Sequence, residues 1–152
     1  MRKRYLVSVV LAMFAVLMGC SSLNIGASEP TPLPFNRHTA EDVLRALSTA
    51  GLPVQNVQRD MLIGRGAPST FSDRYVFEIE RIAPLGGQIL IFSTASALAE
   101  WENYIAQLRA NSNTRRDVVY VFVKNNVMLQ VNAALTTQEA NAFRAALNSL
   151  SG

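Results

Sequence analysis

The chain has 152 residues, of which 14 are Lys or Arg and 11 are Asp or Glu, and its formal net charge is +3. It contains one cysteine and one histidine. These counts argue against a disulfide framework and a zinc site, because both need several Cys or His side chains. The length suits one domain with a sizeable hydrophobic core.

The first 20 residues have the order of a secretory leader. Residues 2–4 are basic, and an apolar run follows over 5–18. This order is typical of a signal peptide that is removed after export. As a helix the run would be about 21 Å long. It would therefore be shorter than the roughly 30 Å hydrocarbon core of a bilayer, which disfavours a membrane-spanning helix.

The segment Leu17–Cys20, with the sequence Leu-Met-Gly-Cys, resembles the lipobox of bacterial lipoproteins. Met18 is bulkier than the small residue usual there. The resemblance implies a diacylglyceryl thioether (or further acylation, such as palmitate) on Cys20 and removal of residues 1–19. Two or three acyl chains would hold the protein on a lipid bilayer, since each buried CH₂ contributes about 0.8 kcal/mol. The alternatives are an uncleaved anchor, ordinary signal-peptidase cleavage after Ala27 and an incidental thiol.

The charged residues of the leader are residues 2–4, all of them basic. Without the leader the chain has eleven basic and eleven acidic residues, so its formal net charge is zero. A nucleic-acid-binding protein normally keeps a basic excess on one face. We therefore expect no nucleic-acid partner. The expected location is the extracytoplasmic side of a cell membrane or outer membrane. Besides the bilayer, an envelope protein or a small ligand is a possible partner.

The sequence divides into three parts: a signal peptide over 1–19, a lipidated cysteine with a flexible Pro-rich tether over 20–36, and one globular domain over 37–152. Phe35 is expected to mark the point where the tether meets the core. In chain order, the first predicted elements are a helix over 40–50, a strand over 53–58 and an irregular segment over 59–73 with an optional strand at 61–63. A strand over 74–82, a turn at Pro84 and Gly86-Gly87, a strand over 88–92 and a helix over 95–110 follow. After a loop over 111–116 come a central strand over 117–123, a turn over 124–126, a strand over 127–133 and a helix that opens at Thr136.

Local signals set the helix boundaries. Thr39 with Asp42, and Thr136 with Glu139, have the spacing of capping boxes. Gly51 suits the end of the first helix. The order α-β-(β)-ββα-ββα predicts an α+β two-layer sandwich, with an antiparallel sheet of four or five strands and about three helices on one face.

No motif in the sequence indicates catalysis. A Gly-x-Ser-x-Gly elbow, a Walker loop and an Asp-rich calcium loop are all missing. The sequence therefore predicts no enzyme, no cofactor and no metal site. Glu78 and Glu80 fall on one face of the predicted strand 74–82, roughly 7 Å apart, and they support only a carboxylate-dependent envelope hydrolase as a remote alternative.

The irregular segment 59–73 is the one candidate binding region, because loops carry binding residues more often than regular elements do. Arg59, Arg65 and Phe71 are its candidate contacts for an anionic or carbohydrate ligand. The simpler interpretation is an irregular connection between two strands.

Two stretches, 39–54 and 121–132, are similar to small bacterial lipoproteins of unknown function. This resemblance implies a shared fold and carries over no catalytic residue. The favoured function is a membrane-anchored, non-catalytic binding or interaction module. The second alternative, beside the hydrolase, is a structural or assembly accessory of an envelope complex.

Overall fold

The computed structural model describes residues 34–35, 37–52, 54–111 and 120–151, within a compact unit over 33–152. Cys20, the predicted signal peptide and nearly all of the tether lie outside the described residues. The elements are α1 (Ala40–Thr49), β1 (Val54–Arg59), β2 (Asp73–Ile79), the 3₁₀ helix η2 (Glu80–Ile82), β3 (Gly86–Ile91), α2 (Ala95–Ala110), β4 (Tyr120–Lys124), β5 (Val127–Val131) and α3 (Thr137–Asn148).

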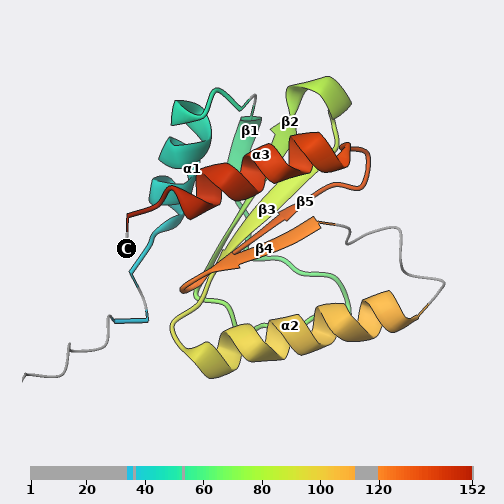
Figure 1. Cartoon of the computed structure of the whole chain (residues 1–152). Helices are drawn as coiled ribbons and strands as arrows, with labels where there is room; N and C mark the ends of the chain where they lie inside the picture. The colour runs from blue at the N-terminus through green and yellow to red at the C-terminus, as the bar shows by residue number, and fades with distance from the viewer. Residues whose placement is uncertain (1–33, 36, 53, 112–119, 152) are drawn as a thin grey trace, which may run out of the picture. The chain divides into compact units, whose positions relative to one another are not determined.

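The five strands form one antiparallel sheet in the order β1-β2-β3-β5-β4 (Figure 1). This confirms the predicted α+β class and the five-strand sheet. The prediction of a central strand over 117–123 is wrong, because β3 pairs with β5 and leaves β4 at the edge. All five residues of β5 are buried. The optional strand at 61–63 does not form.

The helices cover both faces of the sheet. α1 and α3 lie on what we call the first face, and α2 lies on the opposite, second face (Figure 1). The expectation of all three helices on one face is therefore corrected. The physical reason is that β3 presents apolar side chains in both directions: Ile89 and Ile91 face α1 and α3, whereas Leu90 faces α2. Each apolar face needs its own cover.

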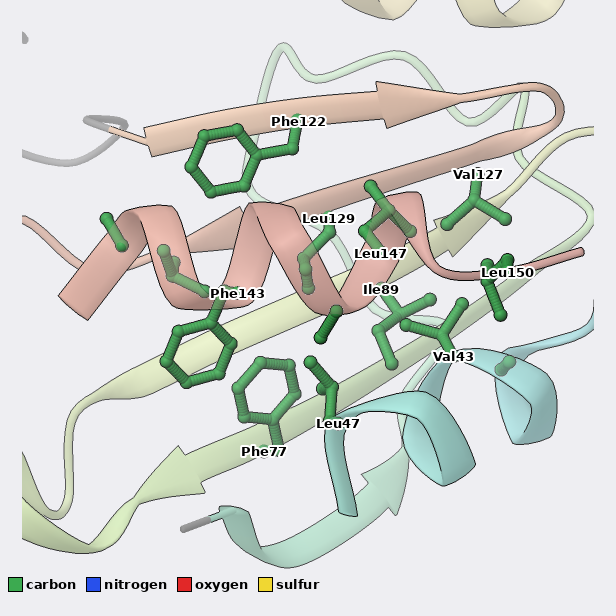
Figure 2. Close-up of a cluster of buried hydrophobic side chains, with 14 of the residues drawn as sticks. Val43, Leu47, Phe77, Ile89, Phe122, Val127, Leu129, Phe143, Leu147 and Leu150 are labelled. Carbon is green, nitrogen blue, oxygen red and sulfur yellow. The ribbon is translucent and has the colours of Figure 1, made fainter. Parts of the chain in front are cut away.

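The larger core fills the first face, and Figure 2 shows its side chains between the sheet and the two helices. Phe77 of β2 stacks on Phe143 of α3, with ring centroids 6.4 Å apart. Val43 and Leu47 of α1 are fully buried beside them. The smaller core on the second face consists of Phe71, Leu90, Phe92, Leu98, Trp101, Ile105 and Met128.

Both predicted capping boxes form. The Thr136 hydroxyl accepts a hydrogen bond from the Glu139 backbone N–H (3.3 Å), and the Glu139 carboxylate accepts one from the Thr136 backbone N–H (2.7 Å). The backbone N–H and the hydroxyl of Thr136 both donate to the Glu139 carboxylate, and with the nearby Arg81 guanidinium they lower the pKa of the Glu139 carboxyl. Thr39 and Asp42 repeat the arrangement at α1.

Asn126, in the turn between β4 and β5, fixes the segment that leads into α1. Its side chain is 1 % exposed. Its Oδ1 accepts hydrogen bonds from the backbone N–H groups of Arg37 (3.2 Å) and His38 (3.0 Å), and its Nδ2 donates to the His38 carbonyl (2.8 Å). Phe35 packs against the smaller core, so the chain meets the core where the sequence predicted.

We expect Asn126→Leu to lower the free energy of unfolding by about 3 kcal/mol, because the His38 N–H and carbonyl lose their partner in a buried site and the Arg37 N–H keeps only the Phe35 carbonyl. Chemical denaturation measures the change. The matched control is Asn125→Gly in the same turn. Asn125 has a φ of 50°, which glycine adopts without strain. Equal stability of the two variants would contradict the role given to Asn126.

Candidate functional site

A cavity of about 370 Å³ lies between α2 and the second face of the sheet. We call it the α2 cleft. Its floor is formed by Arg74, Gln88 and Gln130 from three neighbouring strands, and its rim by the loop over 63–67. Its wall belongs to the second half of α2. The wall residues are Trp101, Tyr104, Ile105 and Leu108.

Strand register makes the floor of the cleft polar. Gln88 of β3 lies directly opposite Gln130 of β5, and because side chains alternate along a strand both point to the second face. The next row on that face is apolar, with Leu90 opposite Met128, and it joins the smaller core. The second face is therefore half core and half polar floor.

A chain of hydrogen bonds crosses this floor. Arg74 Nε donates to Gln88 Oε1 (2.6 Å), and Gln88 Nε2 donates to Gln130 Oε1 (2.7 Å). Because a guanidinium only donates, Gln88 must turn its oxygen toward Arg74. The NH₂ group of Gln88 then donates to the Gln130 oxygen, so the NH₂ group of Gln130 points away from Gln88. Arg74 thereby orients both amides.

Arg74 also fixes the loop that borders the cleft. Its NH1 donates to the Asp60 carbonyl (2.9 Å), to the Asp60 carboxylate (3.1 Å) and to the Leu62 carbonyl. The Arg74 side chain is only 14 % exposed. With its backbone held in this way, the loop presents the Leu62 side chain to solvent at 82 % exposure.

The wall of the cleft is aromatic where it meets the smaller core. Trp101 packs edge-on against Phe71 and Tyr104, with centroid distances of 6.0 Å and 5.7 Å. The Trp101 residue is 4 % exposed. Its buried indole N–H has no hydrogen-bond partner within the described part of the chain.

The structure separates the three binding residues that the sequence singled out. Arg65 lies at the rim of the α2 cleft. Phe71 is buried against Trp101 in the smaller core. Arg59 is paired with Asp73 at 2.7 Å between β1 and β2, and it does not line the cleft. Arg65 is the one that shares the cleft with the polar floor.

Sequence reasoning missed the floor residues Arg74, Gln88 and Gln130 as a site. A signal was present, since Gln88 and Gln130 each interrupt an otherwise apolar strand, Gly86–Ile91 and Val127–Val131. A buried amide in such a strand needs a hydrogen-bond partner. Placing the two amides opposite each other required the pairing of β3 with β5.

A larger hollow of about 450 Å³ lies between α1 and the end of α3, but two of its charged residues, Asp42 and Arg45, already interact on α1. Asp42 closes the capping box and lies 3.5 Å from Arg45. His38 also lines this hollow. Burial, with Arg37 and Lys124 nearby, lowers the pKa of the His38 imidazole, which favours its neutral form. We therefore regard the α2 cleft as the better candidate site.

The carboxylate pair considered from the sequence does not form. β2 ends at Ile79, so Glu80 lies in η2 rather than on the strand face of Glu78. Glu78 accepts a hydrogen bond from Asn56 (2.8 Å). Neither carboxylate lines the α2 cleft. In the described ranges, no group of three or more His, Cys, Asp or Glu is placed to hold a metal ion.

None of the helices that the structure describes is long and apolar enough to cross a bilayer. Comparison of the chain with known protein families, characterised proteins and solved structures gave no significant match.

Proposed function

We propose that this chain is a membrane-anchored, extracytoplasmic lipoprotein whose domain is a non-catalytic binding module. The anchor rests on the Leu17–Cys20 sequence pattern. The binding role rests on the α2 cleft, which lies on the opposite face of the sheet from α1 and α3. Ligand sites are typically concave and mostly apolar, with a few oriented polar groups.

The observation that carries the binding role is the oriented polar floor beneath an aromatic wall. A polar row across the interior of a sheet is less favourable than an apolar one unless its groups are satisfied. Here the row Gln88–Gln130 borders a cavity rather than the covered core. This arrangement is expected where polar groups serve a ligand, and an apolar pair in their place would stabilise the fold at least as well.

A second candidate, an assembly accessory, is favoured by the loop tip. Met61 and Leu62 are 43 % and 82 % exposed, and Arg74 holds the backbone that displays them. Exposed apolar side chains on a fixed backbone suit a protein partner. In this case the tip, rather than the cleft, would lose exposure on binding.

Hydrogen exchange of the full-length protein, with and without a soluble bacterial envelope extract, tests the binding role. We expect slower exchange in α2 and in the loop over 60–67, while α1 serves as an unchanged internal reference. Tyr104→Ala, which removes part of the cleft wall, should abolish the protection. Protection of the Met61–Leu62 tip that survives in Tyr104→Ala would favour the accessory role. The absence of any protection would contradict a binding module.

A further inference from the structure

We propose that the α2 cleft binds a small organic anion, namely a carboxylate carried on an aromatic or aliphatic body. This inference rests on the binding function proposed above and names its ligand class. It follows from three features of the cleft: the free end of the hydrogen-bond chain, the sign of the charges that line the cavity, and the chemistry of the wall.

The hydrogen-bond chain ends in a donor without a good acceptor. Gln130 is 7 % exposed, and its Nε2 contacts Met128 Sδ at 3.2 Å. A thioether sulfur is a weak acceptor, so this buried NH₂ group is poorly satisfied. Gln130 lines the α2 cleft and also a neighbouring hollow of about 380 Å³ that shares Arg74 and Gln88. An oxygen atom of a ligand would supply the missing acceptor.

The described residues that line the cleft carry positive charge. Arg65 and Arg74 are the charged ones among them, and none of these described lining residues is a carboxylate. Arg74 is partly neutralised by Asp60, whereas Arg65 forms no ion pair in the part of the chain that the structure describes. The Arg74 charge also polarises the two amides, because hydrogen bonds in a chain strengthen one another. Both effects favour an anionic acceptor.

The wall of the cleft determines the chemistry of the part of the ligand that carries the carboxylate. The half-buried Tyr104 and Leu108 offer an aromatic and aliphatic surface beside the donor floor, and Trp101 and Ile105 complete the wall at 4 % and 3 % exposure. A body that packs on this wall places a terminal carboxylate between Gln130 and the rim residue Arg65. The volume of about 370 Å³ is at the small end of ligand sites. The ligand is therefore a compact acid or the acidic end of a longer molecule.

The experiment uses full-length protein in detergent and two probes of the same shape, 2-naphthoate and 2-naphthamide. Trp101 is the single tryptophan of the chain, so its fluorescence reports occupancy of the cleft. We expect 2-naphthoate to quench it saturably and to bind about tenfold more tightly than the neutral amide, because charge-assisted hydrogen bonds are the stronger ones.

Two variants test whether the preference for 2-naphthoate arises in the α2 cleft. Gln130→Glu keeps the side-chain shape but replaces the terminal donor with a negative charge, and it should weaken 2-naphthoate at least about tenfold. Arg65→Gln changes an exposed loop residue, and it should weaken the binding of 2-naphthoate about threefold without changing the binding of 2-naphthamide. Arg45→Gln, on α1, is the matched control and should change neither. Because every variant is measured in the same detergent, partitioning of a probe into detergent affects its measured affinity for every variant equally.

Equal affinity for the two probes, no saturable quenching by 2-naphthoate, or unchanged binding in both Gln130→Glu and Arg65→Gln would each overturn the proposal. These failures differ from failure of the binding function. If envelope extract still protects α2 from hydrogen exchange while 2-naphthoate does not bind, the cleft binds a ligand of another class.

Discussion

Replacing Gly86 with alanine should lower the free energy of unfolding by at least about 3 kcal/mol, because the added methyl group meets backbone that cannot move alone. An ideal Cβ at Gly86 lies 1.8 Å from the Phe77 carbonyl oxygen and 2.6 Å from the Glu78 Cα. Relief would require β2 and β3 to separate at the point where Gly86 pairs with Glu78. The melting temperature should fall by about 10 °C or more.

Gly64→Ala is the matched control for this substitution. Its added Cβ has no heavy atom within 4 Å, so its melting temperature should stay within a few degrees of the wild-type value, as for most surface changes. Thermal denaturation of both variants by circular dichroism makes the comparison. A Gly86→Ala protein as stable as Gly64→Ala would show that β2 and β3 do not approach as closely as described.

Cys20→Ala should move the protein from the membrane fraction to the soluble extracytoplasmic fraction, or leave its leader uncleaved. The effect should be nearly complete, since roughly 0.8 kcal/mol per buried CH₂ over two acyl chains makes a firm anchor and no polybasic segment replaces it. Cell fractionation with immunoblotting measures the distribution, and Ser21→Ala is the neighbouring control. Membrane retention of a processed Cys20→Ala protein would contradict the anchor.

Local features of the fold could be predicted because their causes lie close together in the sequence. The helix predicted over 95–110 coincides with α2 (Ala95–Ala110), and both Thr-led capping boxes form. The helical spacing of Leu98, Trp101, Ile105 and Leu108 in the sequence predicts an apolar stripe on this helix, and the first three of them are buried while Leu108 is half-buried. Such a stripe tells which side of a helix is covered, but not which face of the sheet covers it.

Features that depend on strand pairing could not be predicted in this way. Gly86 and Gly87 were expected in a turn, yet they belong to β3, where Phe77 and the Gln130 carbonyl leave no space for a side chain at Gly87. Similarly, the polar floor exists because β5 rather than β4 lies beside β3. Of the three predicted site residues, Arg65 lines the cleft, because it belongs to the loop whose backbone Arg74 binds.

The mass of the N-terminal peptide of the mature protein, isolated from bacterial membranes, tests most directly the claim that this domain is held outside the cell by lipid. We predict a peptide that begins at Cys20 and carries the mass of a diacylglyceryl group, with or without a further acyl chain. An unmodified chain that begins near Ser28, or one that still begins at Met1, would contradict the lipid anchor and the location that the proposed function requires.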